Sequence, residues 1–120
     1  MKVANLTMRV CLERKRISLP RLLIQSLGNP SHLNFWFGDG GDSLIISPAS
    51  KDELYAYEIP QYYWRNANQG CEVARIAFLL ALQQGMNWEK GGRYIFYGVM
   101  KESEGIPAAV FNLTEGMRLR

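Results

Sequence analysis

The side chains that could perform chemistry are few in this chain of 120 residues. It contains one histidine, His32, and two cysteines, Cys11 and Cys71, which lie far apart in the sequence. A tetrahedral zinc site would need two carboxylates in addition to these residues, and a Ser-His-Asp or Cys-His arrangement would have to include His32. Two distant cysteines form no disulfide framework, so we expect both thiols to be reduced. The sequence therefore predicts no enzyme activity, no metal and no cofactor.

The other reactive side chains have simpler interpretations. His32 precedes an expected strand, so we expect it in a turn or on the surface. Cys71 lies near an expected helix start, where a thiol pKa can fall. No histidine lies near it in sequence, and we interpret it as an inert thiol. The carboxylate pairs Asp52-Glu53 and Glu102/Glu104 lie in expected exposed turns, where nothing would raise a pKa, so no acid–base dyad is predicted.

Positive charge is concentrated at the start of the chain. The whole sequence carries a net charge of +3, but residues 1–30 hold six basic residues against one acidic residue, a net +5, and the remainder carries −2. The basic residues of this segment are Lys2, Arg9, Arg14, Lys15, Arg16 and Arg21. Such asymmetry indicates an anionic partner, most often nucleic acid. The alternative is a solvated strand edge that positive charge protects from pairing with other strands.

The same segment has clear element signals. Loosely alternating apolar residues predict a strand over Val3–Leu12, which Arg16–Leu19 continues or resumes. Pro20 suits the first turn of a helix, and Gly28 suits its end, so a short helix should lie between them. The β-rich residues 33–37 and 43–47 flank a loop rich in glycine and aspartate, which predicts a hairpin.

The second half is organised differently. Residues 48–70 form a connecting region with five aromatic residues, Tyr55, Tyr57, Tyr62, Tyr63 and Trp64. They could pack against a long helix, form a stacking platform for single-stranded nucleic acid, or line a pocket. Residues 70–84 have high helix propensity with apolar residues around most of the circumference, which predicts a buried helix. Residues 92–100, 108–113 and 117–120 predict a small antiparallel meander.

Residues 9–48, RVCLERKRISLPRLLIQSLGNPSHLNFWFGDGGDSLIISP, resemble the AbrB/SpoVT-type swapped-hairpin domain. The matching features are Arg16-Ile17-Ser18-Leu19-Pro20, then Leu27-Gly28, then a strand–turn–strand that ends at Pro48. The resemblance implies an AbrB-like barrel of β-α-β-β units, in which two chains exchange hairpins as a homodimer. The predicted fold is thus α+β and mainly β, with this module at residues 1–50. Residues 51–120 would be a C-terminal extension that packs as one unit with it.

The resemblance also implies a function. Members of the family are bacterial transcription regulators or antitoxins that bind double-stranded DNA. Their DNA-contacting positions correspond here to Arg9, Arg14, Lys15 and Arg16, and Arg21 lies beside them at the first helical turn. Phosphate contacts would supply affinity, and arginine side chains could read guanine edges. The first hypothesis is therefore a dimeric DNA-binding regulator or antitoxin-like protein.

Three departures from the family pattern support an alternative. Lys15 stands where many DNA-binding relatives have glycine, and Ile24 and Gln25 stand where one subgroup has two arginines. The apolar cluster 35–37 suits a protein interface better than a phosphate backbone. The alternative hypothesis is a protein-interaction module with the same fold that has lost DNA binding, in which residues 14–16 form a solvated loop with one structural arginine.

The cellular location follows from what the sequence lacks. The first residues show no continuous apolar stretch of the signal-peptide type, and Val73–Leu82, the most apolar run, is about half the length that crosses a bilayer. We expect a cytoplasmic protein with no membrane partner.

Overall fold

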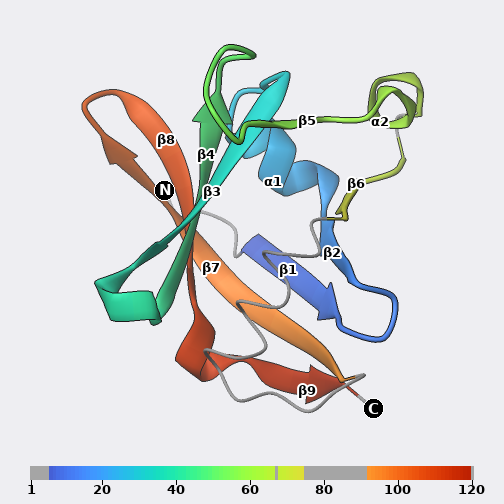
Figure 1. Ribbon diagram of the computed structural model, residues 1–120, viewed down its shortest axis with the longest axis vertical. Helices are drawn as coiled ribbons and strands as arrows, with labels where there is room; N and C mark the ends of the chain where they lie inside the picture. The colour runs from blue at the N-terminus through green and yellow to red at the C-terminus, as the bar shows by residue number, and fades with distance from the viewer. Residues whose placement is uncertain (1–5, 67, 75–91, 120) are drawn as a thin grey trace.

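The computed structural model describes residues 6–66, 68–74 and 92–119, and these residues form a mainly β fold (Figure 1). All strand pairings are antiparallel, and the strands belong to one curled sheet with the order β5-β3-β4-β8-β7-β1-β2-β6, where β9 pairs with β7. The strands are β1 (Leu6–Cys11), β2 (Arg16–Leu19), β3 (His32–Gly38), β4 (Ser43–Ala49), β5 (Tyr57–Glu58), β6 (Cys71–Val73), β7 (Arg93–Ser103), β8 (Ile106–Asn112) and β9 (Met117–Leu119). The helices are α1 (Arg21–Ser26) and α2 (Gln61–Arg65), with 3₁₀ turns η1 (Asp39–Gly41) and η2 (Leu113–Glu115). The prediction of an α+β, mainly β class is confirmed; neither described helix has the length and apolar character that crossing a bilayer requires.

The first hairpin, β1–β2, has one buried face. Alternate residues of β1 are buried, among them Leu6, Met8 and Val10, while Arg9 between them is exposed. This period of two places the apolar side chains in the core and the intervening ones on the outer face of the sheet. Of the strand expected over Val3–Leu12, residues 6–11 form β1 and residues 3–5 lie outside the described residues. After a turn at residues 12–15 the chain resumes as β2 at Arg16.

The short helix α1 follows the pattern of its flanking residues. It starts directly after Pro20 and ends at Ser26, and a left-handed Gly28 with φ of 87° follows two residues later. The amide of Gly28 donates to the carbonyl of Gln25 at 3.0 Å, and the amide of Asn29 donates to that of Ile24 at 3.0 Å. A helix this short has little stability of its own. The burial of Leu23 and Ile24 in the core keeps it in place.

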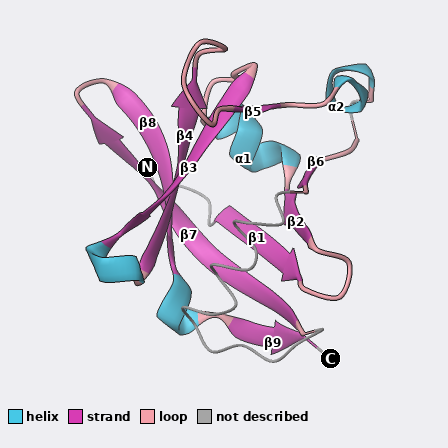
Figure 2. Cartoon of the chain, in the orientation of Figure 1, coloured by secondary structure: helices cyan, strands magenta, loops and turns pink. Residues whose placement is uncertain are grey.

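Strands β7 and β8 lie between the two N-terminal hairpins. One edge of β7 pairs with β1, and β8 pairs with β4, the second strand of the expected hairpin. The two segments divided at residue 50 thus contribute strands to a single sheet (Figure 2). One core cluster contains Leu6 from the first segment and Phe96 and Phe111 from the second. Both hairpins find hydrogen-bonding partners within their own chain.

The structure corrects two expectations about the second half. Cys71–Val73 forms strand β6 beside β2, where the start of a helix was expected, because the edge of β2 offers backbone groups that local propensity does not reveal. The remainder of the expected helix lies outside the described residues. The expected meander is also different: β9 pairs with Arg93–Ile95 of β7, not with β8. Because β7 has 11 residues and β8 has 7, β7 can pair with both along one edge.

A glycine in the centre of the sheet gives a test of this packing. Gly98 lies opposite Phe111, and a Cβ added at Gly98 would stand 2.7 Å from Cδ1 of that ring and 2.7 Å from the carbonyl oxygen of Val110. We expect Gly98→Ala to lower the free energy of unfolding by about 1–3 kcal/mol, because the ring and the backbone must both move. Urea denaturation measures the change. The control is Glu102→Ala, an exposed position of the same strand, and an equal effect of both variants would contradict the register.

Candidate functional site

The outer face of the β1–β2 hairpin brings three arginines together. Cys11 of β1 lies opposite Arg16 of β2 and, on its other side, opposite Arg93 of β7. Residues directly opposite each other in an antiparallel pair project from the same face of the sheet. Arg9, two residues before Cys11, projects from that face as well. The register therefore places Arg9, Arg16 and Arg93 around Cys11.

The spacing of these arginines follows from sheet geometry. Neighbouring strands lie about 5 Å apart, so the Cα atoms of Arg16 and Arg93, on either side of Cys11, are about 10 Å apart. Arg9 is the diagonal neighbour of both, at about 7–8 Å. Arginine side chains are long enough to cover the ground between these positions, so the three guanidinium groups present one continuous positive area.

The turn at residues 12–15 adds two cations beside this area. Arg14 and Lys15 are exposed, and the amide of Lys15 donates to the carbonyl of Leu12 at 3.3 Å, which closes the turn. We call Arg9, Arg14, Lys15, Arg16 and Arg93 the basic surface; all five are exposed. None of their side chains makes a hydrogen bond or an ion pair with another residue that the structure describes. Their exposed side chains can therefore contact an external anion. The same turn also carries one acidic residue, Glu13.

Arg21, the fifth predicted contact, is placed differently. Its Nε donates to the carbonyl oxygen of Gln69 at 3.0 Å, and its Nη2 donates to the carbonyl oxygens of Tyr63 and Asn66. Its Cζ lies 3.9 Å from the centre of the Tyr63 ring, a cation–π contact. The guanidinium thus joins the start of α1 to α2 and the loop that follows it. Three of its five N–H donors are directed at carbonyl oxygens of the chain itself.

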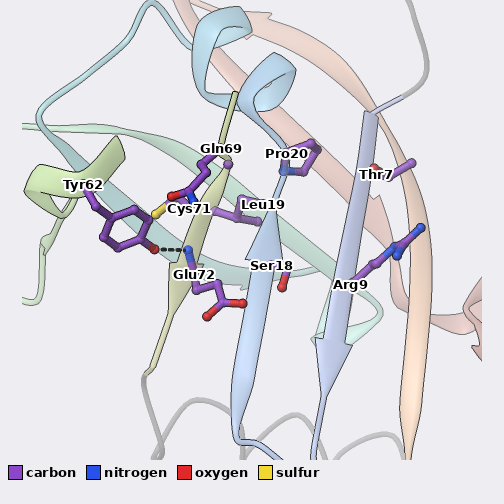
Figure 3. A pocket seen from close by; sticks show the side chains of 10 residues that line it. Thr7, Arg9, Ser18, Leu19, Pro20, Tyr62, Gln69, Cys71 and Glu72 are labelled. Atoms are coloured by element: carbon purple, nitrogen blue, oxygen red, sulfur yellow. Dashed lines mark hydrogen bonds between the residues drawn. The ribbon is translucent and has the colours of Figure 1, made fainter. Parts of the chain in front are cut away.

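A pocket of about 600 Å³ adjoins the basic surface and shares Arg9 with it. Its floor is formed by β1, β2 and β6, and Tyr62 of α2 with Gln69 and Gly70 lines one side (Figure 3). Its lining is mixed: Thr7, Arg9, Ser18, Leu19, Pro20, Tyr62, Gln69, Gly70, Cys71 and Glu72. Burial raises the pKa of the Cys71 thiol to about 11, with a smaller contribution from the negative charge of Glu72. This thiol is therefore protonated at neutral pH, which fits an unreactive cysteine.

The remaining candidates offer no catalytic arrangement. The Nδ1 atom of His32 lies 2.8 Å from the hydroxyl of its neighbour Ser31, at the start of β3. Within residues 6–66, 68–74 and 92–119, no three histidine, cysteine or acidic side chains are grouped as a metal site would need. Of the aromatic segment, Tyr63 is fully buried and its hydroxyl donates to Oδ1 of Asn29 at 3.1 Å, whereas Tyr55 is exposed. The long helix against which this segment was expected to pack lies outside the described residues.

Four members of the basic surface can be recognised in the sequence, whereas Arg93 cannot. Arg9, Arg14, Lys15 and Arg16 are close in sequence, so their charge was visible as a local excess. Arg93 lies 77 positions after Arg16 and joins them only through the pairing of β7 with β1. The strand expected from residue 92 indicated that Arg93 lies near the start of a strand. It did not indicate which strand would pair with it.

Comparison of the chain with protein-family models, with curated proteins and with solved structures gave no match. The resemblance of residues 9–48 to the swapped-hairpin domain consequently stays an interpretation of the sequence.

The contrast between Arg21 and the basic surface is testable. We expect Arg21→Lys to lower the free energy of unfolding by about 1–3 kcal/mol, because one ammonium group cannot reach three carbonyl oxygens in different directions. Arg16→Lys, which leaves a free surface charge in place, should change it by less than about 0.5 kcal/mol. Urea denaturation of both variants gives the comparison. Equal stability of the two variants would show that Arg21 does not hold α2.

Proposed function

We propose that this protein binds double-stranded DNA through the basic surface, as a homodimeric transcription regulator or antitoxin-like protein. The observation that carries the proposal is the set of five exposed cations on the β1–β2 hairpin, its turn and the adjoining start of β7, whose side chains are paired with no described residue. Five basic groups can each neutralise a phosphate and release its condensed counterion, which is the main source of affinity for a nucleic acid backbone. The residues 9–48 that resemble the swapped-hairpin domain contribute four of the five.

The turn conformation supports the same proposal. Lys15 has φ of 55°, in the left-handed region that glycine adopts most readily. Many members of the proposed family carry glycine at this position. The left-handed backbone at Lys15 is the conformation for which glycine is best suited. The turn extends beyond the paired strands, and its tip presents Arg14 to a groove or backbone. Arg21 is left out of the proposed interface because carbonyl oxygens already engage it.

The DNA titration is designed around this turn. The variant Arg14→Ala/Lys15→Gly/Arg16→Ala removes three charges, and glycine at residue 15 keeps the left-handed turn without strain. The variant should bind a mixed-sequence duplex about 10- to 100-fold more weakly, and the slope of log K against log salt should fall by about 2–3 between about 50 mM and 200 mM salt. Fluorescence anisotropy measures both quantities.

The matched control is Lys51→Ala/Arg65→Ala/Lys101→Ala, which removes three exposed charges outside the basic surface. It should bind within about threefold of the wild type, because only long-range charge is lost. No binding at the lower salt concentration, or the same loss in both triple variants, would overturn the proposal. Failure of DNA binding would leave the protein-interaction module as the function to pursue.

The second candidate, the protein-interaction module, is favoured by the β3–β4 hairpin. Trp36 and Phe37, close to its tip, are 55% and 42% exposed. Large aromatic side chains at this exposure are the usual anchors of protein interfaces. In the homodimer that we propose, they would lie in the contact between the two chains.

This placement predicts an effect on assembly. Trp36→Ser/Phe37→Ser should convert a dimer to a monomer at micromolar concentration, since the two rings supply the apolar area of the contact. Sedimentation velocity gives the mass of each species. As a control, Leu54→Ser/Tyr55→Ser removes two more exposed side chains elsewhere and should leave the mass unchanged. A wild-type monomer, or a dimer that survives the hairpin variant, would contradict the placement.

A further inference from the structure

Two opposite charges flank a hydroxyl in one row of the sheet. Arg9 of β1 lies opposite Ser18 of β2, and Ser18 lies opposite Glu72 of β6. All three side chains project from the outer face and line the pocket (Figure 3). The Cα atoms at the two ends of this row are two strand spacings apart, about 10 Å. A cation and a carboxylate thus stand at opposite ends of the same cavity.

The position of Glu72 is held by two tyrosines. Its backbone amide donates to the hydroxyl oxygen of Tyr62 at 2.8 Å, and its carbonyl oxygen accepts from the hydroxyl of Tyr57 at 3.0 Å. Among the described strands β6 is the last in the sheet, so these backbone groups have no further strand as partner. The two tyrosine hydroxyls provide the hydrogen bonds that a further strand would otherwise make. The backbone of Glu72 is thereby fixed beside the pocket, and its side chain is part of the lining.

Both charges are unused within the described part of the chain. Neither the guanidinium of Arg9 nor the carboxylate of Glu72 makes a hydrogen bond or ion pair with a residue that the structure describes. They lie two strand positions apart, and the structure records no ion pair between them. A ligand that satisfies both must carry an anionic group at one end and hydrogen-bond donors at the other.

We propose that this pocket binds a mononucleotide, with its phosphate on Arg9 and the amino edge of its base on Glu72. A volume of about 600 Å³ exceeds what a single amino acid would fill and lies within the range of small-ligand sites. A carboxylate accepts from the amino group of cytosine, whereas the corresponding position of uracil is a carbonyl that repels it. Ser18 lies between the two ends, and Thr7 and Gln69 add further polar groups to the lining. The proposal stands whether or not the basic surface binds DNA.

Three ligands separate the two ends of the site. Isothermal titration with CMP, UMP and cytidine compares a full ligand with one that lacks the amino group and one that lacks the phosphate. CMP should bind the wild-type protein about tenfold or more tightly than either of the others, because each removes a hydrogen bond to a charged group.

The variants assign each end to its residue. Arg9→Gln should bind CMP and cytidine equally, and Glu72→Gln should bind CMP and UMP equally, because a carboxamide can donate as well as accept. Arg14→Gln, which removes a charge outside the pocket, should retain the wild-type order of the three ligands. Circular dichroism confirms that each variant is folded.

The results that would contradict nucleotide binding differ from a failure of DNA binding. No binding of CMP at millimolar concentration, equal affinity for CMP and UMP in the wild-type protein, or an equal loss of CMP affinity in Arg14→Gln and Arg9→Gln would each overturn the proposal. The last outcome would show that phosphate is attracted by general positive charge and not by the pocket.

Discussion

The pairing of β7 with β1 is the constraint on which the rest of the structure depends. It joins a strand from the end of the chain to one from its start, and β7 carries β8 with it to the second hairpin. One register then determines three things at once. It places Gly98 opposite Leu6, buries alternate residues of β1 in a common core, and brings Arg93 beside Cys11. A shift by one residue would turn every one of these side chains to the opposite face, so the core and the basic surface are specified by the same pairing.

A second interaction divides the positive charge of the first 30 residues into two roles. Arg21 donates its hydrogen bonds to carbonyl oxygens that lie 42 to 48 positions later in the chain. These bonds hold α2 and the following loop against α1, and the same segment supplies Tyr62 and Gln69 to the pocket. The remaining arginines are exposed on the sheet and its turn. The positive charge of this segment thus has two roles: Arg21 stabilises the fold, and the other arginines are exposed on the surface.

How much of this could be predicted from the sequence depends on the range of each interaction. The alternation in β1, the pair Pro20 and Gly28 around α1, and the glycine-rich loop before β4 are local signals, and the structure has the corresponding elements. Cys71–Val73 was expected to be helical because its neighbours have high helix propensity, yet the free edge of β2 makes it a strand. The site shows the same limit. Arg9 and Arg16 could be found from local charge, but Arg93 needed the register of β7, and the separate role of Arg21 needed the position of the α2 loop.

Arg9 belongs to both proposed sites, and this has a thermodynamic consequence. One guanidinium cannot hold a phosphate of DNA and a phosphate of a mononucleotide in different places at the same time, so the two ligands compete for it. By linkage, if the nucleotide lowers the affinity for DNA by a given factor, DNA lowers the affinity for the nucleotide by the same factor. The effect is bounded by what Arg9 alone contributes, about one phosphate contact among five, because the other four cations stay with the DNA. The geometry therefore favours modulation of DNA affinity by the nucleotide over complete displacement, and it locates the coupling in the one side chain where the sheet face and the pocket meet.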